Sequence, residues 1–368
     1  MENAYRLTPL DELFLQRAYE LAARGIGNTS PNPPVGAVVV QDGRLVGEGY
    51  HHRAGASHAE TNALRQAGPD ARGSTLYVSL EPCRHIGRTP PCTQALVEAG
   101  VARVVAGTLD PTKNGGGADE LRARGVDVSI ADDPAARDLI ETFARKDPNR
   151  PYVALKMAMS LDGAVASEPG AAQQLSSEAE SRFVRELRVA HDAVMVGAGT
   201  IRVDDPRLTV RPPHDRLREY VRIVACQAGT VPRSARVFVP EAGYAKTIVL
   251  APSALANRLS DLRDVADVVC VGDSSEAALD LRAAMTSLHD RGIASLLCEG
   301  GPTLAAGLLA AGQVDRFYWA VAPVFLCDAR SVRVLAPGAS NALDLRLRFD
   351  RIERVGDDVV LSGPVDDV

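Results

Sequence analysis

The sequence predicts a layered α/β fold that is divided into two domains. Short apolar runs alternate with amphipathic stretches, which is typical of strands joined by helices in a sheet that is at least partly parallel. The chain has 368 residues, which is enough for two domains. Residues 147–151 are charged, contain two prolines and lie between an expected helix and a new strand. We therefore expect one domain over residues 1–147 and a second over residues 148–368.

The first domain opens with an expected amphipathic helix over residues 11–25, which Gly25 would cap. Residues 35–40 and 45–46 are apolar and are joined by Asp42-Gly43, which predicts a β-hairpin. A helix over residues 58–66 would begin at Ser57 as its N-cap. The expected elements that follow are a strand at 75–79, a helix at 92–99, a strand at 101–107, a helix at 120–125, a strand at 126–130 and a helix at 135–146.

The second domain shows the same alternation. Its expected elements are a strand at 152–157, helices at 176–189 and 201–205, a strand at 192–196, a helix at 304–311, and strands at 314–321, 352–355 and 359–362. Glycine turns at 197–200 and 299–303 stand where a strand meets a helix. Such a turn exposes backbone N–H groups to an anion, so both are candidate phosphate sites, although turns of this kind are also common without a ligand.

The composition excludes several classes of protein. The chain is 46% hydrophobic and 24% charged, with a formal net charge of −6 and no basic tract, which argues against nucleic acid as the main partner. No apolar run approaches the roughly 20 residues that span a bilayer. The first ten residues lack the layout of a signal peptide. We expect a cytoplasmic protein.

The six cysteines differ in their surroundings. Cys83 and Cys92 share a polar loop with prolines on both sides, whereas the other four lie in or beside apolar runs. Free cysteine in an apolar run behaves as a small hydrophobic residue, so we interpret those four as buried thiols. A disulfide framework is not expected in a long cytosolic chain.

A candidate metal site is formed by His58, Cys83 and Cys92. One imidazole and two thiolates suit Zn²⁺, with a fourth position left for water. Glu60 follows the histidine by two residues, and the order His-x-Glu, Pro-Cys, Cys is that of zinc-dependent nucleobase deaminases. Eight residues separate the two thiols, whereas the usual spacing is two. Structural zinc sites are normally closed by four protein ligands, so three ligands favour a catalytic zinc, with Glu60 as the catalytic acid and base.

These motifs resemble the bifunctional riboflavin-biosynthesis deaminase/reductase family. The resemblance is carried by Asn32-Pro-Pro-Val-Gly36, Gly49-Tyr-His51, Gly55, His58-Ala-Glu60 and the whole stretch from Glu81-Pro-Cys83 to Cys92. The long spacing between the thiols is that family's own form of the deaminase motif. The resemblance extends over nearly the whole chain and implies a cytidine-deaminase-like three-layer domain followed by a dihydrofolate-reductase-like α/β domain.

For the first domain, the resemblance implies hydrolytic deamination of 2,5-diamino-6-ribosylamino-4(3H)-pyrimidinone 5′-phosphate. His58, Cys83 and Cys92 would hold the zinc, and Glu60 would move the protons. Residues at the family's substrate positions are Asn32, His51, His85 and Arg88. An amide and imidazoles can bind the edge of a ring, and arginine matches a phosphate. The alternative to a binding role is a turn residue for Asn32, which precedes Pro33, and a solvated loop charge for Arg88.

For the second domain, the resemblance implies NADPH-dependent reduction of the ribosyl group to a ribityl chain by a homo-oligomer, either a dimer or a tetramer. The expected cofactor-binding residues are Lys156, Ala158, Ser160, Thr200, Asp204, Gly300, Gly301, Pro302 and Thr303. The expected substrate-binding residues are Arg188, Leu208, Arg211 and Glu299. Small molecules, rather than nucleic acid or a membrane, would be its partners.

Several positions depart from the family pattern. The second domain has Ala164 where a basic residue is usual, Gln174 in place of a tryptophan, and Cys226-Gln227 in place of Asp-Ser. Three alternatives follow: a reductase with a changed pocket, a reductase for a different sugar-like substrate, or a deaminase alone whose second domain has decayed or been re-purposed, as in a secondary-metabolite pathway. In the first domain, residues 112–117 also depart, and Gly115 to Gly117 suggest a flexible loop around the substrate.

Overall fold

The computed structural model describes residues 7–85, 90–210, 216–227, 230–273, 278–335 and 345–365. The chain divides into two compact units, Met1–Ala144 and Arg145–Val368, and each is described by itself below. The domain boundary that we place after residue 147 stays a prediction, because compactness alone does not define a domain that folds independently. Among the described residues, no helix has the length and apolar character that a membrane span requires.

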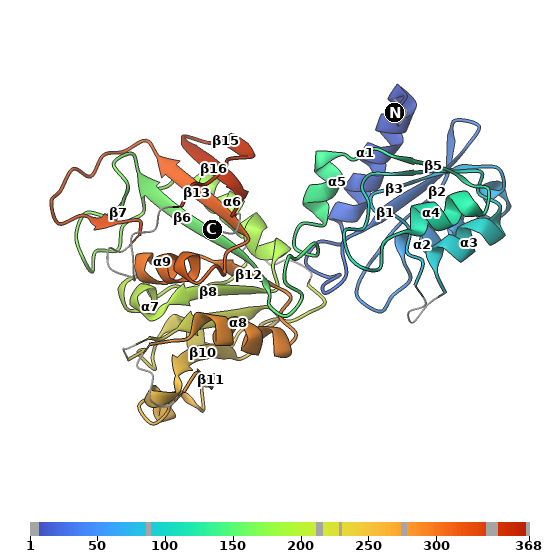
Figure 1. Ribbon diagram of the computed structural model, residues 1–368. Coiled ribbons are helices and arrows are strands. Elements are labelled where there is room, and N and C mark those ends of the chain that lie inside the picture. The colour runs from blue at the N-terminus through green and yellow to red at the C-terminus, as the bar shows by residue number, and fades with distance from the viewer. Residues whose placement is uncertain are drawn as a thin grey trace. The chain divides into compact units, whose positions relative to one another are not determined.

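The N-terminal unit is built on a five-stranded sheet with the order β2-β1-β3-β4-β5 (Figure 1). The first two strands form the hairpin, β1 also pairs antiparallel with β3, and β3, β4 and β5 are parallel. The strands are β1 (Gly36–Gln41), β2 (Arg44–Tyr50), β3 (Thr75–Val78), β4 (Arg103–Ala106) and β5 (Asp127–Ile130). The helices are α1 (Pro9–Ala23), α2 (Ala59–Ala67), α3 (Cys92–Ala99), α4 (Gly117–Ala123) and α5 (Pro134–Leu139), with the short 3₁₀ turn η1 (Gly68–Ala71).

Helices cover both faces of this sheet, which gives three layers. On one face, α2, α3 and α4 contribute Ala63, Leu96 and Leu121 to a core with alternate residues of the strands. On the other face, α1 and α5 contribute Leu15 and Ala136 to a second core. The cytidine-deaminase-like three-layer arrangement expected from the sequence is therefore confirmed.

Most predicted elements of this unit are present, with differences at their ends. The hairpin is confirmed: Asp42 and Gly43 both have positive φ values, 52° and 74°, as a tight two-residue turn requires. The predicted cap at Ser57 is wrong, because His58 occupies the N-cap of α2 and makes no side-chain capping bond. Gly25 does not cap α1 either. It lies against His51, whose carbonyl oxygen would be 2.7 Å from an added Cβ.

The C-terminal unit is built on a nine-stranded sheet with the order β11-β10-β9-β8-β12-β6-β13-β16-β15 (Figure 1). Neighbours from β11 to β13 are parallel, and β16 and β15 complete the sheet in antiparallel fashion. The strands are β6 (Tyr152–Ser160), β8 (Ala193–Gly197), β9 (Val221–Ala225), β10 (Thr247–Pro252), β11 (Ala266–Val271), β12 (Ser295–Cys298), β13 (Arg316–Ala322), β15 (Arg351–Val355) and β16 (Asp358–Pro364), while β7 (Ala164–Ala166) pairs with β14 (Val332–Arg333).

Helices also cover both faces of this second sheet. The longer helices are α6 (Glu178–Ala190), α7 (Ala198–Asp204), α8 (Leu281–Asp290) and α9 (Pro302–Ala310). The core beneath α8 and α9 contains Leu288 and Leu308, while Leu187 and Ile201 of α6 and α7 are buried against the opposite face. The central strands β8 and β12 are apolar and buried nearly throughout, as strands covered on both faces must be. This parallel α/β sheet confirms the fold class expected for the second domain.

Candidate active sites

The three predicted zinc ligands converge in the N-terminal unit. His58 lies at the start of α2, Cys83 in the loop after β3, and Cys92 at the first position of α3. Their ligand atoms all lie within 4.8 Å of one another. The His58 Nδ1 atom is 3.2 Å from the Cys92 sulfur and 3.5 Å from the Cys83 sulfur. An imidazole and two thiols at one point fit Zn²⁺ and leave the fourth position of a tetrahedral site to a small molecule.

The surroundings of the Cys83 sulfur favour its charged form, whereas the pKa of the Cys92 thiol is raised by its hydrogen bond with Cys83 and by burial. The Cys92 thiol and backbone N–H, together with His58, lower the pKa of the Cys83 thiol, and the backbone N–H lies 3.4 Å from that sulfur. A lowered pKa favours the thiolate, which is the form that binds metal. Glu60 is only 3% exposed, and burial raises the pKa of its carboxyl group. Its place in the first turn of α2 puts it beside the cluster without making it a ligand.

Two of the predicted substrate residues lie beside the ligands. The Asn32 amide nitrogen is 3.2 Å from His51 Nε2, and His51 Nδ1 is 3.1 Å from the carbonyl oxygen of Ser57. The rings of His51 and His58 meet edge to face at 5.5 Å. Burial lowers the pKa of His51, so its ring is neutral, donating from Nδ1 to Ser57 and accepting at Nε2 from Asn32. His85 is exposed in the loop after Cys83, and Arg88 lies outside the described residues.

The glycine loop before α4 packs beneath the metal ligands. Its partner is Glu81, a buried carboxylate that accepts hydrogen bonds from the backbone N–H groups of Asp110, Gly116 and Ala118 at 3.0, 3.2 and 2.7 Å. A Cβ atom on Gly117 would lie 1.8 Å from the carbonyl oxygen of Pro82. The glycines allow this close approach of two backbones, and the expectation of a flexible loop around the substrate stays a prediction.

The C-terminal unit contains a cavity of about 950 Å³ over the carboxyl-terminal halves of β6, β8 and β12. Crevices at the carboxyl ends of parallel strands are the usual binding place in such sheets, and this volume suits a nucleotide-sized ligand. Ten of the predicted cofactor- and substrate-binding residues line it: Lys156, Ala158, Arg188, Thr200, Asp204, Leu208, Glu299, Gly301, Pro302 and Thr303. The residues present therefore fit a nucleotide cofactor.

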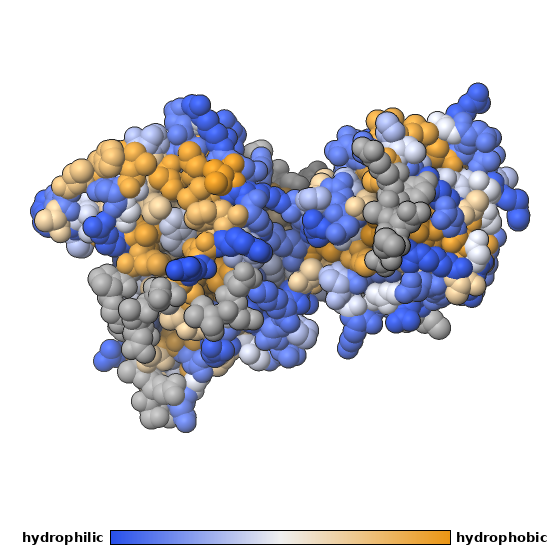
Figure 2. Space-filling view, turned by 45° about the horizontal axis from the view of Figure 1, so that its top comes forward, coloured by the Kyte–Doolittle hydropathy of each residue, from blue (hydrophilic) through white to orange (hydrophobic). Residues whose placement is uncertain are grey.

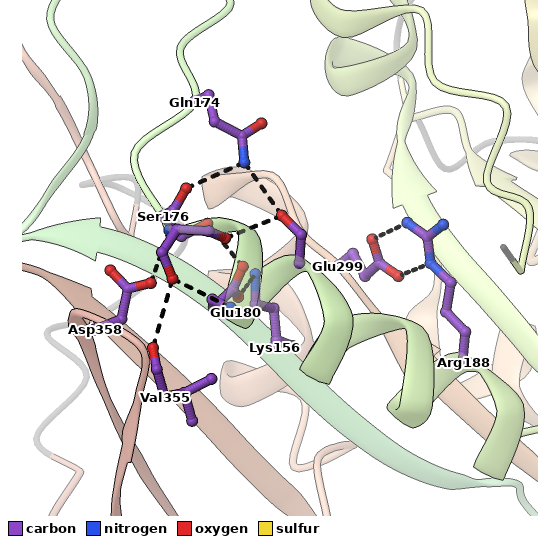
Figure 3. A network of polar contacts seen from close by, with 10 residues as sticks. Lys156, Gln174, Ser176, Glu180, Arg188, Glu299, Val355 and Asp358 are labelled. Atoms are coloured by element: carbon purple, nitrogen blue, oxygen red, sulfur yellow. Dashed lines mark hydrogen bonds and ion pairs between the residues drawn. The ribbon is translucent and has the colours of Figure 1, made fainter. Parts of the chain in front are cut away.

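Arg188 and Glu299, both predicted to bind substrate, are paired with each other (Figure 3). The Nε and Nη2 atoms of Arg188 lie 2.5 and 2.6 Å from the two Glu299 oxygens, and Nη1 donates to the carbonyl oxygen of Thr209 at 2.8 Å. This two-pronged geometry fixes both side chains in the cavity wall. Lys156 is likewise paired with a carboxylate, that of Glu180, a residue that the sequence analysis did not single out.

The two predicted glycine turns are joined to one another. The N–H of Gly197 donates to the carbonyl oxygen of Gly300 at 2.9 Å, and the N–H of Gly301 donates to the Thr200 hydroxyl at 3.2 Å. The turns therefore form one wall of the cavity. Gly300 itself is not among the lining residues, since it packs against the sulfur of Met157, 2.6 Å from where its Cβ would be.

The remaining predicted residues have varied places. The hydroxyl of Ser160 exchanges hydrogen bonds with the backbone of Ala164, so it holds the turn between β6 and β7 and does not line the cavity. Gln174 does line it, and its amide donates to the carbonyl oxygen of Ser176 at 3.3 Å. Cys226 is buried, whereas Gln227 lines the cavity. Arg211 lies outside the described residues.

The fold and sites define a two-domain enzyme in which a zinc-dependent deaminase is joined to a nucleotide-dependent reductase. Comparison with known families agrees: residues 8–108 match the cytidine and deoxycytidylate deaminase zinc-binding region, and residues 151–361 match the RibD C-terminal domain. The chain is 40% identical to the riboflavin biosynthesis protein RibD of Escherichia coli, over 95% of this chain and 98% of that one. The chain belongs to the RibD family of bifunctional enzymes.

Solved structures support the same assignment. A RibD structure from Acinetobacter baumannii matches with a TM-score of 0.79 and 33% identity, covering 97% of this chain and 99% of that one. A deaminase/reductase structure from Thermotoga maritima matches with a TM-score of 0.78 and 32% identity, covering 96% and 98%. The protein is thus an enzyme of riboflavin biosynthesis that uses Zn²⁺ for deamination and NADPH for the reduction that follows. The comparisons give no support to a deaminase with a decayed or re-purposed second domain.

Proposed function

We propose that the chain deaminates 2,5-diamino-6-ribosylamino-4(3H)-pyrimidinone 5′-phosphate and then reduces the ribosyl group of the product. The Thermotoga maritima relative is described as a diaminohydroxyphosphoribosylaminopyrimidine deaminase and 5-amino-6-(5-phosphoribosylamino)uracil reductase. The observation that carries the proposal is the convergence of His58, Cys83 and Cys92 beside the buried carboxyl group of Glu60, in a chain that also has a nucleotide-sized cavity.

In the deaminase, His58, Cys83 and Cys92 would hold the zinc. When bound, zinc supplies the Lewis acidity that makes a water molecule nucleophilic near neutral pH. Glu60 takes one proton from the attacking water and gives it to the ring nitrogen, then takes the second proton from the added hydroxyl group and gives it to the amino group, which leaves as ammonia; an N=C–NH₂ group and water thus become HN–C=O and NH₃. Its exclusion from solvent favours this exchange with the substrate over exchange with bulk water.

Asn32 and His51 would bind the edge of the pyrimidine. Their mutual hydrogen bond and the bond from His51 to Ser57 fix both side chains before the substrate arrives. A neutral imidazole suits this role, because it accepts the Asn32 N–H and orients that amide without placing a positive charge beside the metal. His85 and Arg88 remain proposed ligands of the substrate phosphate.

In the reductase, NADPH supplies a hydride to the ribosyl C1′ carbon when it is bound. The wall formed by the two glycine turns, with Thr200 and Asp204, would hold the cofactor, and Gly301 to Thr303 offer the N-terminal end of α9 to its phosphates. Arg188, Glu299, Leu208 and Arg211 would hold the sugar phosphate. Because Glu299 already fixes Arg188, the guanidinium is oriented before the ligand binds.

One experiment separates the two activities. Purified protein is given the ribosylamino diaminopyrimidinone phosphate and NADPH, and the release of ammonia and the oxidation of NADPH are followed separately. We expect both, with NADPH oxidation dependent on prior deamination. Ammonia release without NADPH oxidation would contradict the reductase proposal, and neither signal would contradict the proposed substrate.

The expected homo-oligomeric state and cytoplasmic location belong to this proposal. Apolar surface is exposed on the C-terminal unit (Figure 2), and Ile352 on the edge strand β15 is 68% exposed. The unpaired edge of β15 also offers backbone groups with which a strand of a second copy could pair. All six cysteines are free thiols, which suits a reducing compartment. Light scattering of the purified chain should give a mass that is a multiple of 39.0 kDa, and a monomer would contradict the oligomeric part.

A further inference from the structure

Lys156 reaches the reductase cavity from the middle of β6. Its ammonium group forms an ion pair with Glu180 in the first turn of α6 (Figure 3). The side chains are only 12% and 2% exposed. Burying a carboxylate is costly unless it is both paired and hydrogen-bonded, so the contacts of Glu180 show what keeps it in this place.

Both oxygens of Glu180 are engaged. One pairs with Lys156, and the other accepts a hydrogen bond from the Ser176 hydroxyl at 2.7 Å. The backbone beneath is also held, since the Glu180 N–H donates to the Ser177 hydroxyl and the Ser177 N–H donates to the buried carboxylate of Asp358 at 2.8 Å. The carboxylate is therefore fixed independently of any ligand.

A fixed carboxylate matters more to a lysine than to an arginine. Arg188 lies two turns further along the same helix. Its planar guanidinium donates from two nitrogen atoms to the two carboxylate oxygens of Glu299. The ammonium of Lys156 sits on a flexible four-carbon stem and has no such built-in orientation. One of its three N–H groups suffices for Glu180, which leaves two for a ligand in the cavity.

We infer that Glu180 is a positioning residue of the reductase: it fixes the Lys156 ammonium so that the remaining N–H groups bind an oxygen of the sugar substrate or of the cofactor. This inference rests on the proposed reductase function. Glu180 touches neither reactant and acts only through Lys156. A displacement of about 1 Å of such a group can cost about a hundredfold in rate.

The first test is Glu180→Gln in the full chain, assayed with the deaminated pyrimidine and NADPH. We expect kcat/KM for NADPH oxidation to fall between about tenfold and a hundredfold, while ammonia release from the diamino substrate is unchanged. Glu180→Asp keeps the charge and should recover part of the loss. The matched control is Glu178→Gln, since Glu178 lies in the same helical turn with its side chain 86% exposed.

The decisive test is a double-mutant cycle with Lys156→Met. If Glu180 acts through Lys156, Glu180→Gln should cost less than about threefold in the Lys156→Met chain. Independent, multiplicative losses would overturn the inference, as would full reductase activity in Glu180→Gln. Should Glu180→Gln fail to fold, judged by thermal unfolding, Glu180→Asp replaces it in the cycle. A wild-type chain that does not oxidise NADPH would remove the proposed reductase function instead.

Discussion

The carboxylate of Asp11, in the first turn of α1, is bound on both oxygens by the guanidinium group of Arg103 on β4, at 2.8 and 3.2 Å. The Tyr77 hydroxyl on β3 donates to the same carboxylate at 2.9 Å. Asp11 also closes the capping box of α1 with Thr8. One carboxylate thus ties the first helix to two neighbouring strands of the deaminase sheet.

This arrangement predicts an acid-sensitive fold. Burial raises the pKa of Asp11, but the hydrogen bonds from Arg103, Thr8 and Tyr77 outweigh it and lower the pKa to about 2. A lowered pKa means that the stabilisation is complete above the unfolded-state pKa of about 4 and is lost as the pH falls through about 2. Over this pH range the free energy of unfolding should fall by about 2 kcal/mol. Hydrogen exchange of the β4 amides, measured from about pH 5 down to about pH 2, should show this loss of stability.

Asp11→Asn should remove most of this pH dependence and cost about 3 kcal/mol near neutral pH, because Arg103 is left without its buried partner. The control is Asp127→Asn. Asp127 also lies near Arg103, at 3.7 Å, but its side chain is 66% exposed, so we expect a change below about 1 kcal/mol. Equal effects of the two substitutions would contradict this assignment.

Loss of a zinc ligand should abolish deamination and spare reduction. Cys83→Ala leaves one thiol and one imidazole, too few for a stable site. We expect zinc content, measured by atomic emission, to fall well below one per chain, with no ammonia release. Cys327 is exposed, so the expectation that it is a buried thiol is wrong, and Cys327→Ala should keep full zinc content. Unchanged zinc in Cys83→Ala would refute the ligand assignment.

Glu60→Gln should separate metal binding from catalysis. The amide is nearly isosteric and Glu60 is not a ligand, so zinc content should stay near that of the wild type. Ammonia release should fall by at least about a thousandfold, because no other group is proposed to carry the protons. The same variant should oxidise NADPH normally when given the deaminated pyrimidine. Substantial deamination by Glu60→Gln would remove the acid–base role.

Local patterns explain what the sequence could predict. The Asp42-Gly43 hairpin follows from the backbone preference of two residues, and the convergence of His58, Cys83 and Cys92 follows from a motif whose spacing is characteristic. Helix ends were less predictable. Ser57 has the side chain of a good cap, but the chain enters α2 one residue later, at His58.

Contacts between distant residues could not be predicted in this way. Glu180 pairs with Lys156 across the interface of a helix and a strand, and no periodicity relates their positions. Glu81 belongs to the Glu-Pro-Cys motif, yet its three backbone donors lie 29, 35 and 37 residues further along the chain. In the sequence, a cluster of three glycines suggests a flexible backbone. In the fold, the same glycines allow two backbone segments to pack closely against each other.

Breaking the Arg188–Glu299 pair should slow reduction strongly without affecting deamination. Glu299→Gln removes the charge that compensates a mostly buried guanidinium and one of the three oxygens that accept its hydrogen bonds. We expect kcat/KM for NADPH oxidation to fall about a hundredfold and the C-terminal unit to lose about 3 kcal/mol of unfolding free energy. Glu186→Gln, at an exposed position on α6, is the control. A variant with normal NADPH oxidation would show that the pair does not shape the cavity.

Gly117→Ala should disturb the zinc site from beneath. The added Cβ would lie 1.8 Å from the carbonyl oxygen of Pro82, and backbone cannot yield as a flexible side chain can. Pro82 must move, and Cys83 with it, so zinc affinity measured by competition with a chelator should fall about tenfold or more. Asp119→Ala changes an exposed residue two positions further along α4 and should have no effect. If Gly117→Ala binds zinc normally, the glycine loop does not support the ligand loop, and the bonds to Glu81 alone must hold it.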